Sequence, residues 1–167
     1  IFTIPVMAAA IIVNIPAVAQ ETEFLGKFGK WEAFKEFNSG KPVCYMGAQP
    51  TKAQGKYKKR GDTYVLVTHR LVEKSFGVVS VSAGYNFLKA SETTVTISAD
   101  TFSLFTDAGH AFAYDKAMDT ALIQAMVRGA HMIIKGTSSR GTKTTDTYSL
   151  NGVSAAWRAI NKACKKK

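Results

Sequence analysis

A hydroxyl-rich segment with an arginine at its centre holds the residue types in this sequence that could do chemistry. Residues 133–150 form a pattern typical of a β-hairpin, and the expected turn carries Ser138, Ser139 and Arg140. A helical pattern leads into this hairpin and another leads out of it. The turn could therefore present hydroxyls and a guanidinium on a fixed support, for nucleophilic chemistry or for contact with an anion.

Nucleophilic chemistry at this turn would require a base and an orienting acid in contact with a serine. By residue type, His69 could supply the base, and Asp107 or Asp146 could supply the acid. The turn, however, is not G-x-S-x-G, and it follows a strand into a hairpin rather than into a helix. We therefore expect no catalytic residues. A hydrolase-like enzyme that uses the Ser/Arg-rich turn with His69 is the alternative.

Metal and cofactor motifs are missing from the sequence. The histidines His69, His110 and His131 are scattered, and no C-x-x-C pair or acidic partner stands at metal-ligand spacing. The phosphate-binding patterns G-x-x-x-x-G-K-[ST] and G-x-G-x-x-G do not occur either. We therefore expect neither a metal nor a cofactor.

Positive charge dominates the composition. The 22 lysines and arginines exceed the 12 aspartates and glutamates, which gives a formal net charge of +10. Residues 50–62 hold five of these basic residues and one acid, with Tyr57 among them. This balance favours anionic partners, and a lysine-rich solvated surface is the alternative. The residues that we expect to contact a partner are Lys58, Lys59, Arg60, His69, Arg70, Ser138 and Arg140.

The first 19 residues differ from the rest of the chain. Residues 1–19 contain no charge, are mostly apolar and end in A-V-A, which is the pattern of a signal peptide with its cleavage site. Because no basic leader precedes them, we expect the sequence to begin inside the signal peptide. Two prolines and an asparagine interrupt the apolar run and disfavour a membrane span. The sequence therefore predicts cleavage after Ala19 and a single domain over residues 20–167.

Export gives the two cysteines a structural meaning, because disulfides form in oxidising compartments. With Cys44 and Cys164 as the whole set, one intramolecular pairing is possible. This bond would close a long loop and contribute about 4–5 kcal/mol in the chain-entropy model. Export also argues against a nucleic acid as the partner.

Short β-branched and aromatic runs separated by turn residues predict a series of strands. In residues 93–97 a mainly apolar face alternates with a polar one, which is typical of a half-buried strand. Residues 24–31 mix glycines with aromatics and predict an irregular segment packed on the domain, and residues 50–62 predict a long loop. The expected strands are 31–37, 43–49, 63–70, 75–85, 93–97, 102–105 and 111–114.

Two helices follow these strands. Asp115 as the N-cap, Arg128 in the last turn and Gly129 at the end define the first helix. Residues 153–164 form the second, with Cys164 on its apolar face. Many short strands with two late helices predict an α+β fold. We expect a mainly antiparallel β sandwich or open barrel with two helices in the C-terminal third.

Several short runs, spread over nearly all of the chain beyond the expected cleavage site, form a recognisable pattern. They are F-G-K-W (28–31), V-C-Y-M (43–46), R-G-D-T-Y-V-L-V-T-H-R (60–70), E-K-S-F (73–76), A-G-Y (83–85), F-S-L-F-T (102–106), K-G-T-S-S-R-G-T (135–142) and T-D-T-Y-S-L (145–150), with Cys164 at the end. This pattern resembles the invasion-associated locus B family of exported proteins from Gram-negative bacteria. Lys30 stands where the family pattern usually has an acid, as F-G-D-W.

The resemblance implies export, a β-rich fold and a family name drawn from host-cell invasion, and it implies no established catalytic residues. From it we expect a protein of the periplasm or the outer surface, or a secreted one, with no membrane span after cleavage. We expect a non-enzymatic protein that binds a protein partner or an anionic envelope component; a purely structural envelope protein is a further alternative. Convergence of His69, Arg70, Ser138 and Arg140 in one pocket would favour a specific ligand, and dispersal would favour a surface role.

Overall fold

The computed structural model describes residues 22–164, so the expected signal peptide, residues 1–19, lies outside the described residues. The strands and helices of this part of the chain are β1 (Thr22–Phe28), β2 (Trp31–Asn38), β3 (Lys41–Ala48), β4 (Lys52–Gly55), β5 (Tyr64–Arg70), β6 (Ser75–Ser82), β7 (Glu92–Ile97), β8 (Asp100–Asp107), β9 (His110–Phe112), α1 (Lys116–Arg128), β10 (His131–Thr137), β11 (Lys143–Ser149) and α2 (Val153–Ala163).

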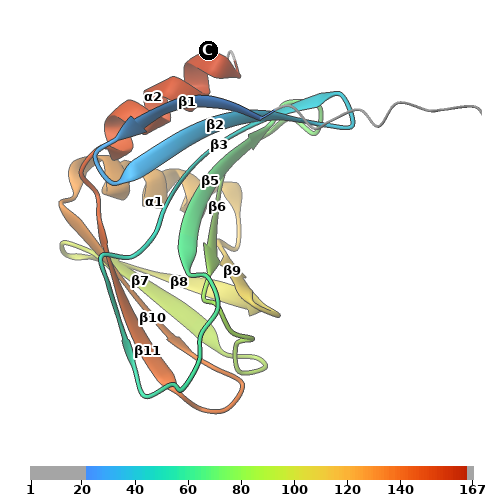
Figure 1. Cartoon of the computed structure of the whole chain (residues 1–167). Coiled ribbons are helices and arrows are strands. Elements are labelled where there is room, and N and C mark those ends of the chain that lie inside the picture. The colour runs from blue at the N-terminus through green and yellow to red at the C-terminus, as the bar shows by residue number, and fades with distance from the viewer. Residues whose placement is uncertain (1–21, 165–167) are drawn as a thin grey trace, which may run out of the picture.

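All of these strands belong to one open antiparallel sheet, in the order β1-β2-β3-β5-β6-β9-β8-β7-β10-β11-β4. The sheet bends strongly; α2 packs on β1, β2 and β3 at one end, and α1 packs on β6 inside the bend (Figure 1). A mainly antiparallel open sheet with two late helices confirms the predicted fold class. The hairpin β10–β11 lies between the two helices in the chain, as its sequence pattern predicts.

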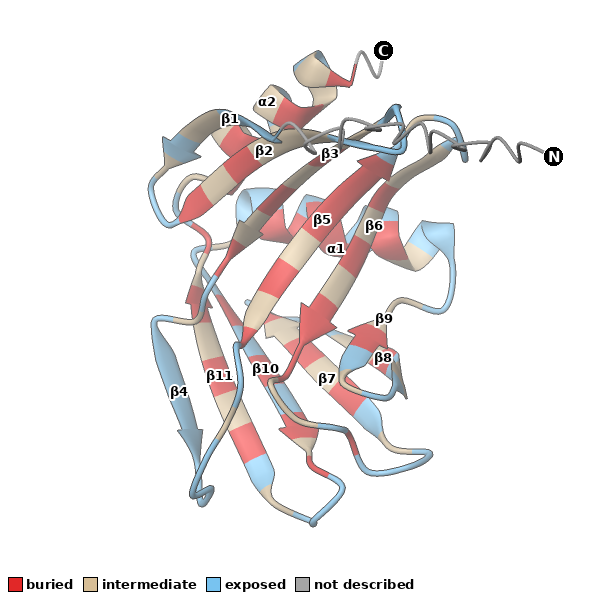
Figure 2. Ribbon diagram, turned by 45° about the vertical axis from the view of Figure 1, so that its right-hand side comes forward, coloured by how far each residue is buried: buried red, intermediate tan, exposed pale blue. Residues whose placement is uncertain are grey.

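The core lies on the inner face of this bent sheet. Along β11 and the first half of β5, buried positions alternate with half-buried ones, drawn red and tan in Figure 2. Trp31, Met46 and Tyr148 are fully buried there. Burying a large apolar side chain contributes about 1.5–3 kcal/mol, so each of these residues stabilises the sheet substantially. The apolar face of α2 is buried as well, through Val153, Ala156 and Ile160.

The expectation of an irregular segment at residues 24–31 is wrong. This stretch holds most of β1, which pairs with β2 from Thr22↔Glu36 to Phe28↔Trp31. Its glycines mark two local features of a hairpin: Gly26 lies at a shift in register, and Gly29 takes a φ of +58° in the turn. Glycine beside aromatic residues therefore indicated a bulge and a tight turn, not irregular chain.

The expectation that residues 50–62 form one unbroken loop is also wrong in part. Residues Lys52–Gly55 form β4, which pairs with β11 at the edge of the sheet. All four residues of β4 are exposed, as the pale blue colour in Figure 2 shows. Because neither of its faces is buried, β4 has no hydrophobic alternation by which the sequence could reveal it.

Both predicted helices and the predicted disulfide are present. The Asp115 carboxylate accepts a hydrogen bond from the Met118 backbone N–H at 2.8 Å, and the Gly129 N–H donates to the end of α1. Cys44 on β3 and Cys164 at the end of α2 form a disulfide, with Cα atoms 6.0 Å apart. Over residues 22–164, no helix has both the length and the apolar character needed to cross a membrane.

Candidate functional site

The turn between β10 and β11 is held by its first serine. The Ser138 hydroxyl accepts hydrogen bonds from the backbone N–H groups of Arg140 (3.3 Å) and Thr142 (3.1 Å). Gly141 takes a φ of +79°, which glycine adopts without strain. Ser138 is buried, so its hydroxyl is committed to shaping the turn. The turn therefore presents the exposed Arg140 side chain from a fixed position.

The basic segment before β5 is fixed to this hairpin by a buried ion pair. Two guanidinium nitrogens of Arg60 contact the two carboxylate oxygens of Asp146 on β11, at 2.7 Å and 2.6 Å. The Arg60 Nε donates to the Ala83 carbonyl at 2.7 Å, and the Tyr57 and Tyr85 rings lie against the guanidinium. The side chains of Arg60 and Asp146 are 5% and 4% exposed. Arg60 is therefore an internal support whose charge is already neutralised.

Burial and charge act in opposite directions on this pair. Burial alone would lower the pKa of Arg60, but the hydrogen bonds and the negative charge of Asp146 raise it, and the net shift is upward. The guanidinium stays charged, as its fixed geometry requires. Burial also raises the pKa of Tyr85, whose hydroxyl lies 2.6 Å from the Thr144 hydroxyl. The tyrosine therefore remains neutral and completes the floor between the two segments.

A hollow of about 610 Å³ lies between the basic segment and the hairpin turn. Four of the cationic side chains that line it have no acidic partner among residues 22–164: Lys56, Lys58, Lys59 and Arg140. We call this feature the basic hollow. Its complete lining consists of Lys56, Tyr57, Lys58, Lys59, Arg60, Gly61, Tyr85, Asn86, Ser138, Ser139, Arg140, Thr142 and Thr144. No aspartate or glutamate is among these described residues, so the hollow carries a net positive charge.

On the hairpin side of the basic hollow, side chains and not backbone groups would have to hold a ligand. The Ser139 N–H donates to the Asn86 carbonyl at 2.7 Å, and the Gly141 N–H donates to the Ser138 carbonyl at 2.8 Å. The N–H groups of Arg140 and Thr142 are taken by the Ser138 hydroxyl. The turn therefore offers no pair of free backbone donors of the kind that stabilises an oxyanion. Within residues 22–164, no three His, Cys, Asp or Glu side chains gather to hold a metal ion.

The structure brings five of the seven predicted contact residues together and places the other two elsewhere. Lys58, Lys59, Arg60, Ser138 and Arg140 all line the basic hollow. His69 and Arg70 lie at the opposite end of β5 from the basic segment. Of the four residues whose convergence would favour a specific ligand, Ser138 and Arg140 therefore lie together, and His69 and Arg70 lie apart from them.

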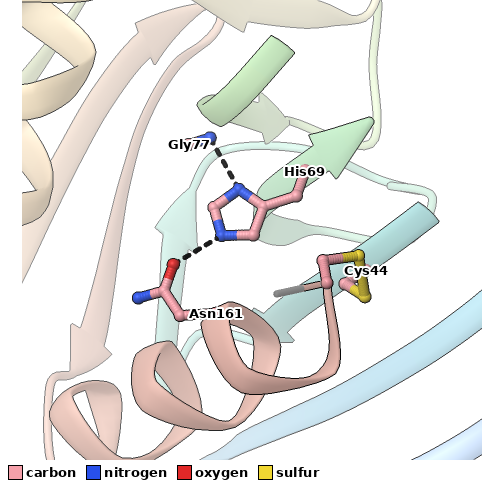
Figure 3. Close-up of a disulfide and its surroundings, with 5 residues drawn as sticks. Cys44, His69, Gly77 and Asn161 are labelled. Carbon is pink, nitrogen blue, oxygen red and sulfur yellow. Dashed lines mark hydrogen bonds between the residues drawn. A yellow bond between two sulfur atoms is a disulfide. The ribbon is translucent and has the colours of Figure 1, made fainter. Parts of the chain in front are cut away.

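His69 is a buried structural residue beside the disulfide. Its Nδ1 accepts a hydrogen bond from the Gly77 N–H at 2.9 Å, so its Nε2 carries the proton and donates to the Asn161 Oδ1 at 2.9 Å (Figure 3). The ring also lies 5.0 Å from the Trp157 ring and is fully buried. These contacts link β5, β6 and α2. Arg70 is exposed and lies 3.7 Å from Glu73, where it adds little to stability.

The sequence did not single out the residues that support the hollow. Tyr85, Asn86 and Thr144 were not expected there, and Asp146 was considered only as an orienting acid. A signal for Asp146 did exist: the alternation of β11 places it on the buried face with Tyr148. A buried carboxylate needs a cationic partner, so this position called for a nearby lysine or arginine.

Comparison with known families gives one match. Residues 31–161 match the model of the family described as Invasion associated locus B (IalB) protein. No curated protein and no solved structure matches the chain. The matched range includes both sides of the basic hollow and the whole of β2 to β11.

Proposed function

Because the chain belongs to the invasion-associated locus B family, we propose that it is an exported, non-enzymatic protein that binds an anionic component of the bacterial envelope in the basic hollow. Export is supported by the signal-peptide pattern of residues 1–19 and by the disulfide between Cys44 and Cys164. The compartment that fits this proposal is the periplasm or the outer surface.

One observation carries the proposal: the basic segment and the hairpin turn, distant in sequence, enclose one hollow with cations on both sides. Lys58 and Lys59 come from the first segment and Arg140 from the second. The Arg60–Asp146 pair joins the two segments. Because this pair is buried and its charges neutralise each other, it is not expected to contact the ligand. A concave surface lined by one sign of charge concentrates ligands of the opposite sign.

The chemistry of these side chains selects the kind of ligand. Arginine binds a carboxylate, sulfate or phosphate group through two parallel hydrogen bonds, whereas lysines act as point charges beside it. An acidic polysaccharide and an anionic lipid headgroup both present such groups. Tyr57 adds an aromatic surface at the side of the hollow, suited to the apolar part of the same ligand.

Two features support binding rather than catalysis. The Ser138 hydroxyl accepts two backbone hydrogen bonds and has no base beside it in the described residues. His69, the expected base, is fully buried and has hydrogen-bond partners at both ring nitrogens. A nucleophilic serine requires a base within hydrogen-bond reach.

Two probes test this proposal: a fluorescent heparin-derived hexasaccharide, read by anisotropy, and vesicles containing phosphatidylglycerol, read by co-sedimentation. We expect the triple variant Lys58→Glu, Lys59→Glu, Arg140→Glu to lose at least about tenfold in affinity for the preferred probe, which corresponds to about 1.4 kcal/mol. Wild-type affinity should also fall as salt is raised, because screening weakens exposed charges.

The matched control is Lys41→Glu, Lys74→Glu, Lys116→Glu, which changes the net charge equally at exposed positions away from the hollow. This control should retain most of the affinity. An equal loss in both triple variants would show binding to total charge and overturn the proposed site. Wild-type protein that binds neither probe would overturn the function and leave a purely structural role.

A further inference from the structure

A second hollow, of about 590 Å³, lies on the outer face of the sheet over β2, β3 and β5. Its volume is in the range of small-ligand sites. Among the described residues, none that lines it also lines the basic hollow. Aromatic and hydrogen-bonding side chains both contribute to its lining, so it is neither a purely apolar groove nor a second cationic site.

A row of aromatic rings crosses the outer face of the sheet, and two of its members, Phe34 and Tyr45, line this outer hollow. Phe24, Phe34 and Tyr45 are direct neighbours across β1, β2 and β3, with ring centroids 5.3 Å apart at each step. Tyr45 follows Cys44 in β3, so it points away from the face that α2 covers. Phe24 is 57% exposed, and Phe34 and Tyr45 are half-buried. The rings therefore offer a flat apolar strip that solvent reaches.

A glycine with no room for a side chain lies in the floor of the outer hollow. Gly47 stands between Glu32 and Leu66 in the pairing of β2, β3 and β5. A Cβ at this position would lie 2.5 Å from the Leu66 Cδ2 and 3.1 Å from the Val65 carbonyl. The missing side chain therefore leaves room for Leu66 to lie over β3, where Leu66 and Gly47 both line the hollow together with Tyr45.

Polar groups form the remaining sides, and the charged ones among them are Glu32 and two lysines, Lys27 and Lys30. The Lys27 Nζ and the Glu32 Oε1 lie 3.0 Å apart and neutralise each other. The Gln49 side chain and the Tyr64 hydroxyl line the hollow without a side-chain hydrogen-bond partner in residues 22–164. Donors and acceptors are thus both present. With Lys27 and Glu32 paired, Lys30 is the one remaining charge of the described lining, so a polyanion gains less here than in the basic hollow with its four cations.

We propose that this outer hollow binds a neutral glycan chain. A pyranose ring has an apolar C–H face, which stacks on an aromatic side chain, and hydroxyls around its edge, which hydrogen-bond to a mixed polar rim. Both complementary surfaces are present here, at Phe34 and Tyr45 and at Glu32, Gln49 and Tyr64. An added peptide strand would need an unpaired sheet edge, whereas β3 is paired on both sides. This site is independent of the proposed function.

Calorimetric titration with two neutral β-1,4-linked tetrasaccharides, N-acetylated chitotetraose and cellotetraose, tests the proposal. We expect one of them to bind wild-type protein, and Phe34→Leu and Tyr45→Leu each to weaken it at least about tenfold, because leucine keeps the apolar bulk but lacks a flat ring. Tyr45→Trp keeps a ring and should keep the affinity. Phe105→Leu, at an exposed aromatic on β8, is the matched control and should change nothing.

The salt dependence of binding distinguishes this site from the basic hollow. As the salt concentration rises, the affinity for a neutral tetrasaccharide should stay unchanged, whereas the affinity for the heparin-derived hexasaccharide should fall. Thermal melting of each variant shows whether it is folded. The proposal is overturned if neither tetrasaccharide binds, or if the leucine variants bind as wild type does. A dimer in sedimentation that Tyr45→Leu abolishes would identify this face as an interface between two copies, which also overturns it.

Discussion

The Asp119 carboxylate is buried where α1 packs on β6, and it accepts a hydrogen bond from the Val79 backbone N–H at 2.9 Å. Burial raises the pKa of Asp119 above its ordinary value of 3.8, because that hydrogen bond and the charge of Lys116 only partly offset the desolvation of the ionised form. The folded state therefore holds this proton more tightly than the unfolded state, and the ionised carboxylate reduces stability.

Asp119→Asn should make the protein more stable than wild type at neutral pH. Asparagine retains an oxygen that can accept from Val79 but carries no buried charge. The stabilisation by Asp119 is complete below pH 3.8 and is lost as pH rises through the raised pKa, so the difference between the two proteins should grow over that interval. Urea unfolding from acid to neutral pH measures it. An asparagine variant that is less stable than wild type at neutral pH contradicts this assignment.

Single residues differ in how far the sequence reveals their roles. Cys44 and Cys164 could be paired from the sequence, because an exported chain with two cysteines has one pairing available. Ser138 and Arg140 could be placed on one turn, since a turn is local. Arg60 could not be recognised as a support, because its partner lies on a strand far along the chain and only the folded sheet brings the two together.

At the scale of elements, the Arg60–Asp146 pair joins the basic segment to β11. Asp146→Ala should destabilise the protein by about 3–5 kcal/mol, because it leaves the Arg60 charge buried without a partner. The affinity for the anionic probe should fall as well, although Asp146 is buried, because the basic segment loses its support. Urea unfolding and the anisotropy titration of the hexasaccharide measure the two effects.

A double variant distinguishes the cost of leaving a buried charge unpaired from the cost of losing the contact between the two side chains. Arg60→Met with Asp146→Leu removes both charges and should recover more than half of the lost stability. Glu73→Ala, which breaks the exposed pair with Arg70, should cost less than about 1 kcal/mol. A cost of Asp146→Ala no larger than that of Glu73→Ala would show that the ion pair does not hold the segment.

Elements with one buried face were predictable, and those without one were not. The hairpin β10–β11 and the helix α2 show the period of two and of 3.6 that burial of one face imposes. Strand β4 has no buried position, and β1 is interrupted by a bulge, so neither shows a clean period. The basic hollow combines a predictable element with an unpredictable one. One side is the turn of the predictable hairpin β10–β11, and the other is the basic segment, which follows the unpredicted strand β4.

At the scale of the whole molecule, the disulfide and the basic hollow lie at opposite ends of the bent sheet (Figure 1). The disulfide, His69 and α2 lie together at one end, where they fix the C-terminal helix on the sheet (Figure 3). The hairpin turn and the basic segment lie at the other end of the bend (Figure 1). The Cys44–Cys164 bond and the His69 contacts therefore lie away from the cations of the basic hollow, whereas the Arg60–Asp146 pair lies next to those cations.

The central claim is that residues 56–61 and 138–144 form one ligand site. Titration of the isotope-labelled protein with the heparin-derived hexasaccharide, followed by amide chemical shifts, tests it most directly. We expect amides in both segments to shift together along one binding curve, while those around His69 and Tyr45 stay in place. Shifts in only one of the two segments, or shifts scattered over all exposed lysines, would contradict the claim.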